Sequence, residues 1–366
     1  MKLIKKYKVR EFEEIRFLNI PIWQKTYTIK NDAKYTNTAL FPKSYEKKFL
    51  NKIIKTIPKK HDFVWIVRTA GLGEAYMLNF MLEELNKKYK AKNPCIVSSN
   101  AFYKEMFELY TDIPFYHIET SNWEEINFAF LKRTYKYKWK KFRVFHCTFY
   151  ESMDLFDNKF VNGEGEDYPT EIRKLAGATK FAKAKQKYSN EIVEQVNEIV
   201  PYLNKDKFVY IIPEPKSVLP VSDTFWLVLC SKIREKGYDI FINTKSGVSK
   251  IGPSAPLNIG QAAYLSSLAK HIVAIRCGFL EVVSSHNIPK HVIYTPHKHN
   301  PVSASEMLRN STLNNYPMVD KNTVFEYNTD ELSETQIIDE IMKGFEDVKN
   351  TKSSDTCSFG FKKSSQ

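Results

Sequence analysis

Residues 62–99 read DFVWIVRTAGLGEAYMLNFMLEELNKKYKAKNPCIVSS, and this segment carries the clearest structural signal in the chain. The apolar run 63–67 precedes a turn with glycines at 71 and 73, and a helical pattern follows from residue 74 to about 88. Residues 95–98 read as a second short strand. A strand, a glycine turn, a helix and a strand in this order are typical of a βαβ unit with a parallel sheet.

The same alternation continues along the chain. A helix at 102–110 and strands at 115–118 and 143–147 are expected to complete a first Rossmann-like layer. A second layer is expected after an amphipathic helix at 191–203. Its strands are predicted at 208–212, 239–243, 272–275 and 291–294, with helices at 224–236, 259–269 and from 278 to about 286. The fold class is therefore α/β, with two Rossmann-like domains.

The composition shift around residues 158–203 places the connection between the two domains. We expect a first domain at 1–190, including a basic N-terminal extension, and a second at 191–328. An acidic amphipathic helix at 329–348 is expected to pack back across the cleft between them. The Ser- and Lys-rich tail, 349–366, is expected to be disordered.

The charge balance favours an anionic partner. Fifty-five Lys and Arg residues against 42 Asp and Glu residues give a net charge of +13. Nucleic acid, an anionic membrane surface, a sugar nucleotide and an acidic glycan all fit this charge. The equally weighted alternative is that the lysines keep the protein in solution, because most alternate with acids and asparagines. No continuous basic stripe with stacking aromatics is present, which disfavours a nucleic-acid partner.

Cysteine usage and hydropathy indicate a cytoplasmic protein. Five cysteines lie far apart with no CxxC pair, which fits a reducing compartment. No apolar run approaches the roughly 18 residues of a membrane span. Attachment to the inner face of a membrane stays open, because the basic amphipathic segment 45–57 could lie on anionic lipid. The favoured alternative is that its apolar stripe covers the first sheet.

The first glycine turn is a candidate site on the acceptor side. Gly71 and Gly73, which follow Arg68, let the backbone approach a ligand at the start of a helix. The dinucleotide fingerprint needs a third glycine where Tyr76 stands, which disfavours a nicotinamide or flavin enzyme. Glu74 could accept the proton of an acceptor hydroxyl, or it could be only a partner for the helix dipole.

The second half offers cations and amides at one sheet edge. Lys216 closely follows a strand, so its ammonium is expected over the carboxyl edge, where open α/β sheets bind ligands. A turn at 276–279 joins another strand to a helix N-terminus beside Arg276. The residues expected to meet a donor diphosphate are Lys216, Ser246, Arg276, Cys277, Gly278, Phe279 and Glu281.

No metal or cofactor is expected. His297 and His299 form an HxH pair, but no third ligand is spaced nearby, so loop histidines are favoured over a zinc site. The chain has no DxD at a strand end to hold a metal-bound sugar nucleotide. It also lacks the GxSxG elbow of a serine hydrolase.

Segments 62–78 and 256–283 resemble the heptosyltransferase-like family of GT-B glycosyltransferases, the glycosyltransferase family 9 type. The second segment is also similar to the donor segment of fucosyltransferases with this fold. The resemblance covers roughly residues 62–118 and 208–296. It implies that Glu74 stands for the family's catalytic aspartate, Lys216 for its donor-phosphate lysine and Gly278 for its phosphate-facing helix start. The family's acid before this glycine is replaced by Cys277.

The resemblance implies two domains facing each other across a cleft and an inverting, metal-independent sugar transfer. The donor would be a nucleotide sugar, and the acceptor a glycan or a lipid-linked, anionic molecule in bacterial surface polysaccharide synthesis. Two alternatives stay open: a sugar-nucleotide epimerase on the same scaffold, and a non-catalytic basic protein that binds glycan or nucleic acid.

Overall fold

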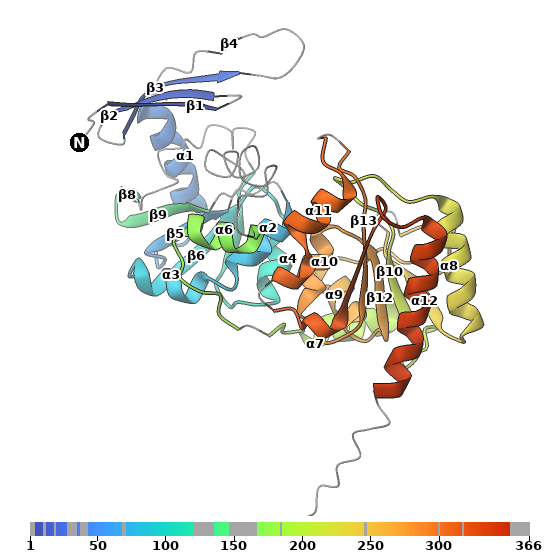
Figure 1. Ribbon diagram of the computed structural model, residues 1–366. Helices are drawn as coiled ribbons and strands as arrows, with labels where there is room; N and C mark the ends of the chain where they lie inside the picture. The colour runs from blue at the N-terminus through green and yellow to red at the C-terminus, as the bar shows by residue number, and fades with distance from the viewer. Residues whose placement is uncertain are drawn as a thin grey trace, which may run out of the picture.

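The computed structural model describes residues 4–9, 12–17, 20–27, 35–36, 43–67, 71–119, 135–145, 167–183, 185–244, 247–298, 301–316 and 318–351. In this part of the chain there are three sheets, two of them dominated by parallel strands. Figure 1 shows the two parallel sheets side by side, each with helices around it, and the third sheet above the first domain.

The N-terminal sheet is antiparallel and follows chain order. Its strands are β1 (Ile4–Val9), β2 (Phe12–Phe17), β3 (Ile20–Tyr27) and β4 (Tyr35–Thr36). The helix α1 (Lys43–Thr56) then connects this sheet to the first domain. Sequence patterns had assigned no strands here, because lysines and glutamates interrupt the apolar alternation.

The first domain has the strand order β7-β6-β5-β9-β8. The strands are β5 (Phe63–Val67), β6 (Pro94–Ser98), β7 (Phe115–His117), β8 (Tyr135–Tyr137) and β9 (Lys140–Phe145). Only the edge strand β8 runs antiparallel to its neighbour. Leu50 and Ile53 of α1, with Ile57 just after it, pack on Val64 and Ile66 of β5. The stripe therefore covers the sheet, and its buried residues are not available to lie on lipid.

The helix expected from residue 74 to 88 is two helices, α2 (Leu72–Leu78) and α3 (Leu82–Lys88). Between them, the amides of Asn79, Phe80 and Met81 bond to carbonyls three residues earlier. The Asn79 side chain also donates to the Tyr76 carbonyl at 3.2 Å. A side chain that competes for backbone carbonyls in this way favours tight turns over a continuing α-helix.

The second domain has five parallel strands in the order β11-β10-β12-β13-β14. They are β10 (Phe208–Ile212), β11 (Asp239–Ile242), β12 (His271–Ile275), β13 (Lys290–Tyr294) and β14 (Val324–Asn328). The helices α8 (Asp223–Glu235), α9 (Ile259–Ser267) and α10 (Gly278–Val282) follow the first three strands in sequence. Strand β14 was not expected, and it extends the sheet beyond β13.

The C-terminal helix corrects an expectation. Helix α12 (Glu334–Thr351) does not pack back across to the first domain, but lies on the second domain beside α8 (Figure 1). Its apolar residues Ile337, Ile341 and Phe345 join the core formed with strands β10 and β12. The physical reason is that α8 alone leaves part of this sheet face uncovered, and the stripe of α12 matches it. The tail beyond Thr351 lies outside the described residues.

The two domains share one apolar core. It runs without interruption from Phe63 and Phe80 of the first domain to Val282 and Tyr294 of the second. Helix α2 packs on α10, and α4 (Tyr103–Glu108) packs on α9. The Tyr110 hydroxyl donates across the interface to the Val282 carbonyl at 2.9 Å. The carboxyl edges of both parallel sheets meet near this interface, where α2 and α10 begin.

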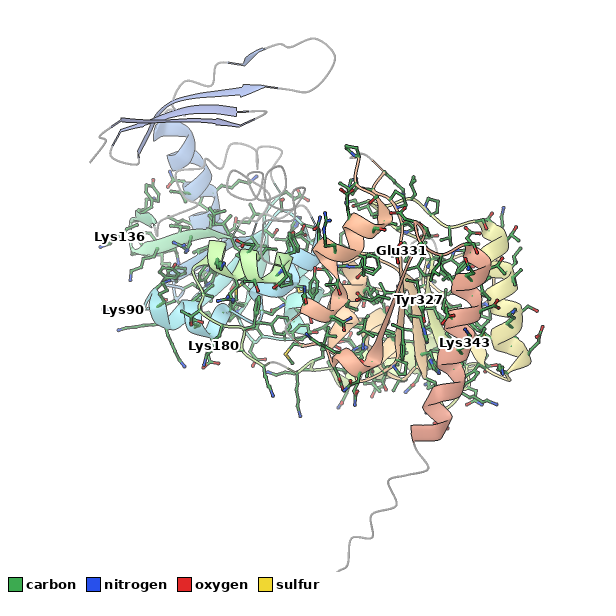
Figure 2. All side chains as sticks on the ribbon, in the orientation of Figure 1. Lys90, Lys136, Lys180, Tyr327, Glu331 and Lys343 are labelled. Atoms are coloured by element: carbon green, nitrogen blue, oxygen red, sulfur yellow. The ribbon has the colours of Figure 1, made fainter. Side chains whose placement is uncertain are left out.

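None of the helices in the described ranges combines the length and the apolar content needed to span a lipid bilayer. Figure 2 shows lysines such as Lys90, Lys136 and Lys180 at the outer end of the first domain, away from the domain interface.

Candidate functional site

Glu74 lies at the start of α2, on the side of the first domain that faces the second. Its carboxylate folds back to accept hydrogen bonds from the Gly71 amide and from its own amide. It also accepts a hydrogen bond of 3.0 Å from the hydroxyl of Tyr168, the first residue of α6 (Tyr168–Ala176). The side chain is only partly buried. This geometry fixes the carboxylate at the start of α2.

At both glycines of the first turn, a neighbouring carboxylate leaves no room for a side chain. A Cβ atom added at Gly71 would lie 2.6 Å from Oε2 of Glu74. A Cβ atom added at Gly73 would lie 1.4 Å from Oε2 of Glu281, which belongs to the second domain. A glycine at 73 is therefore needed for the two domains to approach as they do.

The environment of Glu74 favours its protonated form. Burial, and after it the negative charge of Glu281, raises the pKa of the Glu74 carboxyl. The hydrogen bonds from Tyr168 and from the helix amides act in the opposite direction and are smaller. The sequence had left open that the helix N-terminus depresses this pKa. The structure shows the reverse direction, which brings the carboxyl closer to the proton affinity of a general base at neutral pH.

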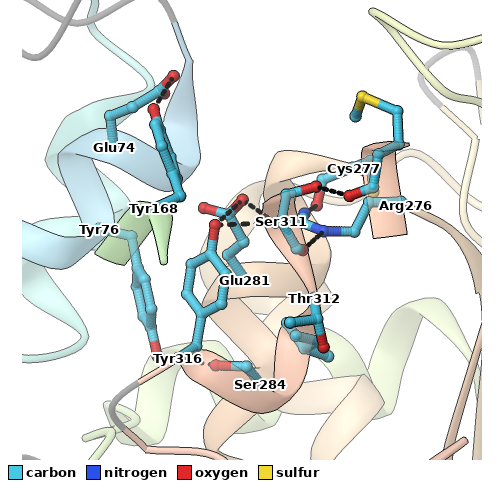
Figure 3. Close-up of polar contacts among 12 residues, drawn as sticks. Glu74, Tyr76, Tyr168, Arg276, Cys277, Glu281, Ser284, Ser311, Thr312 and Tyr316 are labelled. Carbon is cyan, nitrogen blue, oxygen red and sulfur yellow. Dashed lines mark hydrogen bonds and ion pairs between the residues drawn. The ribbon is translucent and has the colours of Figure 1, made fainter. Parts of the chain in front are cut away.

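Arg276 does not present its guanidinium to a ligand, contrary to expectation. It is buried, and it donates to Glu281 Oε1 at 2.5 Å and to the Tyr316 hydroxyl at 2.8 Å. It also donates to the carbonyls of Ser311 and Cys277. Figure 3 shows this network beside the first turn. Arg276 therefore holds the turn that follows β12 against the segment around residue 311, because a buried charge needs partners of this kind.

Glu281 occupies an unexpected position between the domains. Its Oε1 accepts from Arg276 and from Tyr316, at 2.5 and 2.8 Å. Its Oε2 is buried and has no hydrogen-bond partner among the described residues. That oxygen lies against Gly73. Tyr316 was missed by the sequence analysis, because it lies about forty residues from Arg276 without a recognisable motif.

The two glycine turns are in contact. A Cβ atom added at Gly278 would lie 3.3 Å from the Gly73 nitrogen and 3.5 Å from Cβ of Leu72. Cys277 and Phe279, on either side of Gly278, are partly buried and pack against the shared core. Burial raises the pKa of the Cys277 thiol. The structure therefore brings the acceptor-side and donor-side turns together with their helix starts adjoining.

Lys216 is exposed in the loop between β10 and α8. This loop is paired with the loop after β13 through a bridge between Val218 and His297. The Lys298 ammonium donates to the Pro215 carbonyl at 3.1 Å and so supports the loop that carries Lys216. Because β10 and β13 flank β12, both lysines emerge at the carboxyl edge on either side of the Arg276 turn. Lys298 was not singled out from the sequence.

Three residues of the sequence analysis, Arg68, Ser246 and His299, lie outside the described residues. Within the ranges that are described, no group of three or more His, Cys, Asp or Glu side chains is arranged to hold a metal ion.

Comparison with known proteins gives the fold. No family model and no curated protein matches the chain. A solved glycosyltransferase of family 9 from Veillonella parvula superposes with a TM-score of 0.51 at 11% identity, covering 78% of this chain and 97% of that one. An ADP-heptose lipopolysaccharide heptosyltransferase II from Escherichia coli superposes with a TM-score of 0.53 at 11% identity, covering 79% of this chain and 99% of that one. The chain therefore has the two-domain GT-B fold of heptosyltransferase-like glycosyltransferases.

Proposed function

We propose that this protein is a glycosyltransferase that moves a sugar from a nucleotide-sugar donor to a hydroxyl of a glycan or lipid-linked acceptor. The observation that carries the proposal is the Glu74 carboxylate. It is held by Tyr168 and placed where the first domain faces the donor turn of the second. The GT-B fold supplies the second argument.

In the proposed mechanism, Glu74 takes the proton of the acceptor hydroxyl as its oxygen attacks the anomeric carbon of the donor. The bond from that carbon to the diphosphate oxygen breaks, and the electron pair leaves with the nucleoside diphosphate. Attack from the face opposite the leaving group inverts the anomeric carbon. The raised pKa of Glu74 suits this role, because a general base is most effective when its pKa lies near the working pH.

The leaving diphosphate needs positive charge and hydrogen-bond donors. Lys216 is an exposed cation at the carboxyl edge of the second sheet, and Lys298, also exposed, supports its loop. The amides of Gly278 and Phe279 are the other proposed contacts. Arg276 acts indirectly, because its guanidinium orients the turn from inside the domain. With these groups in place we propose transfer without a divalent metal.

The chemical class of the donor is proposed from the solved relative that carries an ADP-heptose name. An ADP-sugar is therefore the first donor to test, with other nucleoside diphosphate sugars beside it. The setting that we propose is bacterial surface polysaccharide synthesis, on the inner face of the cytoplasmic membrane. The net charge of +13 supports an anionic acceptor there.

The test is the isosteric variant Glu74→Gln. The single amide oxygen of glutamine can keep the hydrogen bonds from the backbone amides, and its NH2 group can donate to the Tyr168 hydroxyl oxygen, so the turn should keep its shape. It cannot take up the proton, so the variant should turn over roughly a hundredfold or more slowly than the parent protein, with donor affinity nearly unchanged. Both proteins are assayed in the presence of EDTA. Nucleoside diphosphate release with and without acceptor is the measurement.

Near-native transfer by a folded Glu74→Gln protein would contradict the assignment and leave Glu74 as a helix-capping residue. Donor turnover without any acceptor, giving an altered sugar still joined to the nucleotide, would identify an epimerase instead. The exposed Glu108→Gln on α4 is the matched control, because it removes a carboxylate away from the turn.

A further inference from the structure

Two side chains from outside α2 act on the Glu74 carboxylate. Tyr168 donates to Oε1 from α6, which follows the first-domain strands in sequence. Glu281 comes from α10 of the second domain and places its Oε2 against Gly73, the residue before Glu74. In Figure 3, Tyr168 and Glu74 lie on one side of this turn and Glu281 with Tyr316 on the other.

The other titratable groups on the elements packed against α2 have partners of their own. The Tyr103 hydroxyl donates to the Gly71 carbonyl at 3.1 Å. Glu105 accepts from the Ile259 amide, and Glu171 pairs with Lys174. Behind Glu281, Arg276 and Tyr316 are both bound to its Oε1. Among the described side chains, those with the largest effect on the Glu74 carboxyl are therefore Glu281 and Tyr168.

We propose that Tyr168 and Glu281 are positioning residues that set the proton affinity of Glu74 in opposite directions, and that the contribution of Glu281 exists only while the two domains are closed. The proposal rests on the function assigned above and adds the regulation of its base. Glu281 is fixed to the second domain through Arg276 and Tyr316, so its charge moves with that domain.

Both groups act on the ionised form of Glu74, in opposite directions. A donated hydrogen bond stabilises the carboxylate, so Tyr168 favours release of the proton. A second negative charge that lacks a hydrogen-bond partner destabilises the carboxylate, so Glu281 favours uptake. Separation of the domains would remove the second effect only. Glu74 would then be the stronger base in the closed form and the weaker base once the two turns have separated.

The experiment measures the titration of Glu74 directly. Protein carrying carboxyl ¹³C-labelled glutamate is titrated by NMR, and the resonance lost in Glu74→Gln identifies residue 74. Tyr168→Phe should raise the midpoint of that resonance, and Glu281→Gln should lower it, each by about half a unit to one unit. Tyr202→Phe and Glu108→Gln, both at exposed positions, are the matched controls and should leave the midpoint unchanged.

Unchanged midpoints in both variants, or shifts in the same direction, would overturn the proposal. Glu281→Gln leaves the Arg276 charge without its ion pair and can destabilise the fold. Tyr168→Phe removes only a hydroxyl and therefore supplies the second, independent arm. The NMR readout needs no substrate, so opposite shifts without any sugar transfer would contradict the proposed function and not this inference. With transfer, the acidic limb of the kcat/KM profile, which reports the free enzyme, should follow the same two directions.

Discussion

Gly73 and Glu281 come from different domains and share one small volume. The carboxylate of Glu281 lies where the side chain of any other residue at 73 would begin. Its Oε1 is tied to Arg276 and Tyr316, so the carboxylate cannot swing away without breaking a buried ion pair. The identity of residue 73 is therefore decided by a contact about two hundred positions away in the sequence.

Gly73→Ala should destabilise the protein by roughly 3 kcal/mol or more, since the Cβ atom displaces the carboxylate from its ion pair. In a Glu281→Ala background the same alanine no longer meets a carboxylate, and its cost should fall to less than about 1 kcal/mol. Urea unfolding of the four proteins in this cycle is the measurement. Equal costs in both backgrounds would show that the two residues are not in contact.

Helix α12 is held to the second sheet by a stack of aromatic rings at the amino ends of two strands. His271 begins β12, and its ring lies 3.8 Å from that of Phe345 of α12. The Nδ1 atom of His271 lies 3.3 Å from the Nε2 atom of His291 in β13. The Nδ1 atom of His291 contacts the hydroxyl of Tyr327. Both histidines are buried and therefore kept neutral, which makes the docking of α12 sensitive to acid.

Burial lowers the pKa of His271 to about 4, from an ordinary value near 6.5. The unfolded chain therefore binds a proton before the folded chain does. The stabilising contribution is complete above about pH 6.5 and is lost as the pH falls from there toward 4. His271→Phe should keep the stack, and should reduce the loss of unfolding free energy between pH 7 and pH 5 by about 2 kcal/mol.

Denaturant titrations at the two pH values measure this difference. The exposed His117 provides the control, and His117→Asn should leave the pH dependence as in the parent protein. A His271→Phe protein that loses as much stability on acidification as the parent would exclude the stack as the acid-sensitive element.

Sequence patterns predicted those elements whose signal is local. Strands at 63–67 and 208–212 and the glycine turns were predictable, because apolar runs and glycines report directly on backbone and burial. The split after α2 involves the side chain of Asn79. The docking of α12 depends on which face of the second sheet is left uncovered. The engagement of Arg276 depends on Tyr316, far along the chain. The last two features are tertiary, and no local pattern encodes them; the first is local, but a single asparagine inside a helical pattern does not announce a break.

At the scale of the whole molecule, the contact between the two glycine turns limits access to the proposed donor site. The Gly278 amide is a proposed phosphate contact, and the same residue turns its Cα toward the first domain, since a Cβ atom added there would lie 3.3 Å from the Gly73 nitrogen. A diphosphate can reach this helix start only if the turns separate. Donor binding should therefore require a relative movement of the domains.

A reversible cross-link tests this movement. A Cβ atom at 278 would lie 3.5 Å from that of residue 72, within the range of about 3.5 to 4.5 Å found in disulfides. The pair Leu72→Cys and Gly278→Cys, in a Cys277→Ser background, should lose nucleoside diphosphate affinity at least tenfold on oxidation and regain it on reduction. Calorimetry on both forms measures this, and the two single cysteines are the controls. Equal affinity of the oxidised and reduced forms would place the donor elsewhere.

The apolar core that crosses from one domain to the other also bears on how the chain is made. During synthesis the first domain leaves the ribosome before β10 to β14 exist, and Tyr76 and Tyr110 then lack their second-domain partners Ser284 and Val282. These side chains stay uncovered until α10 arrives, some 170 residues later. The nascent first half is therefore a natural client for chaperones that bind exposed apolar surface. Its expression as an isolated domain should yield aggregate, while the full chain folds as one cooperative unit.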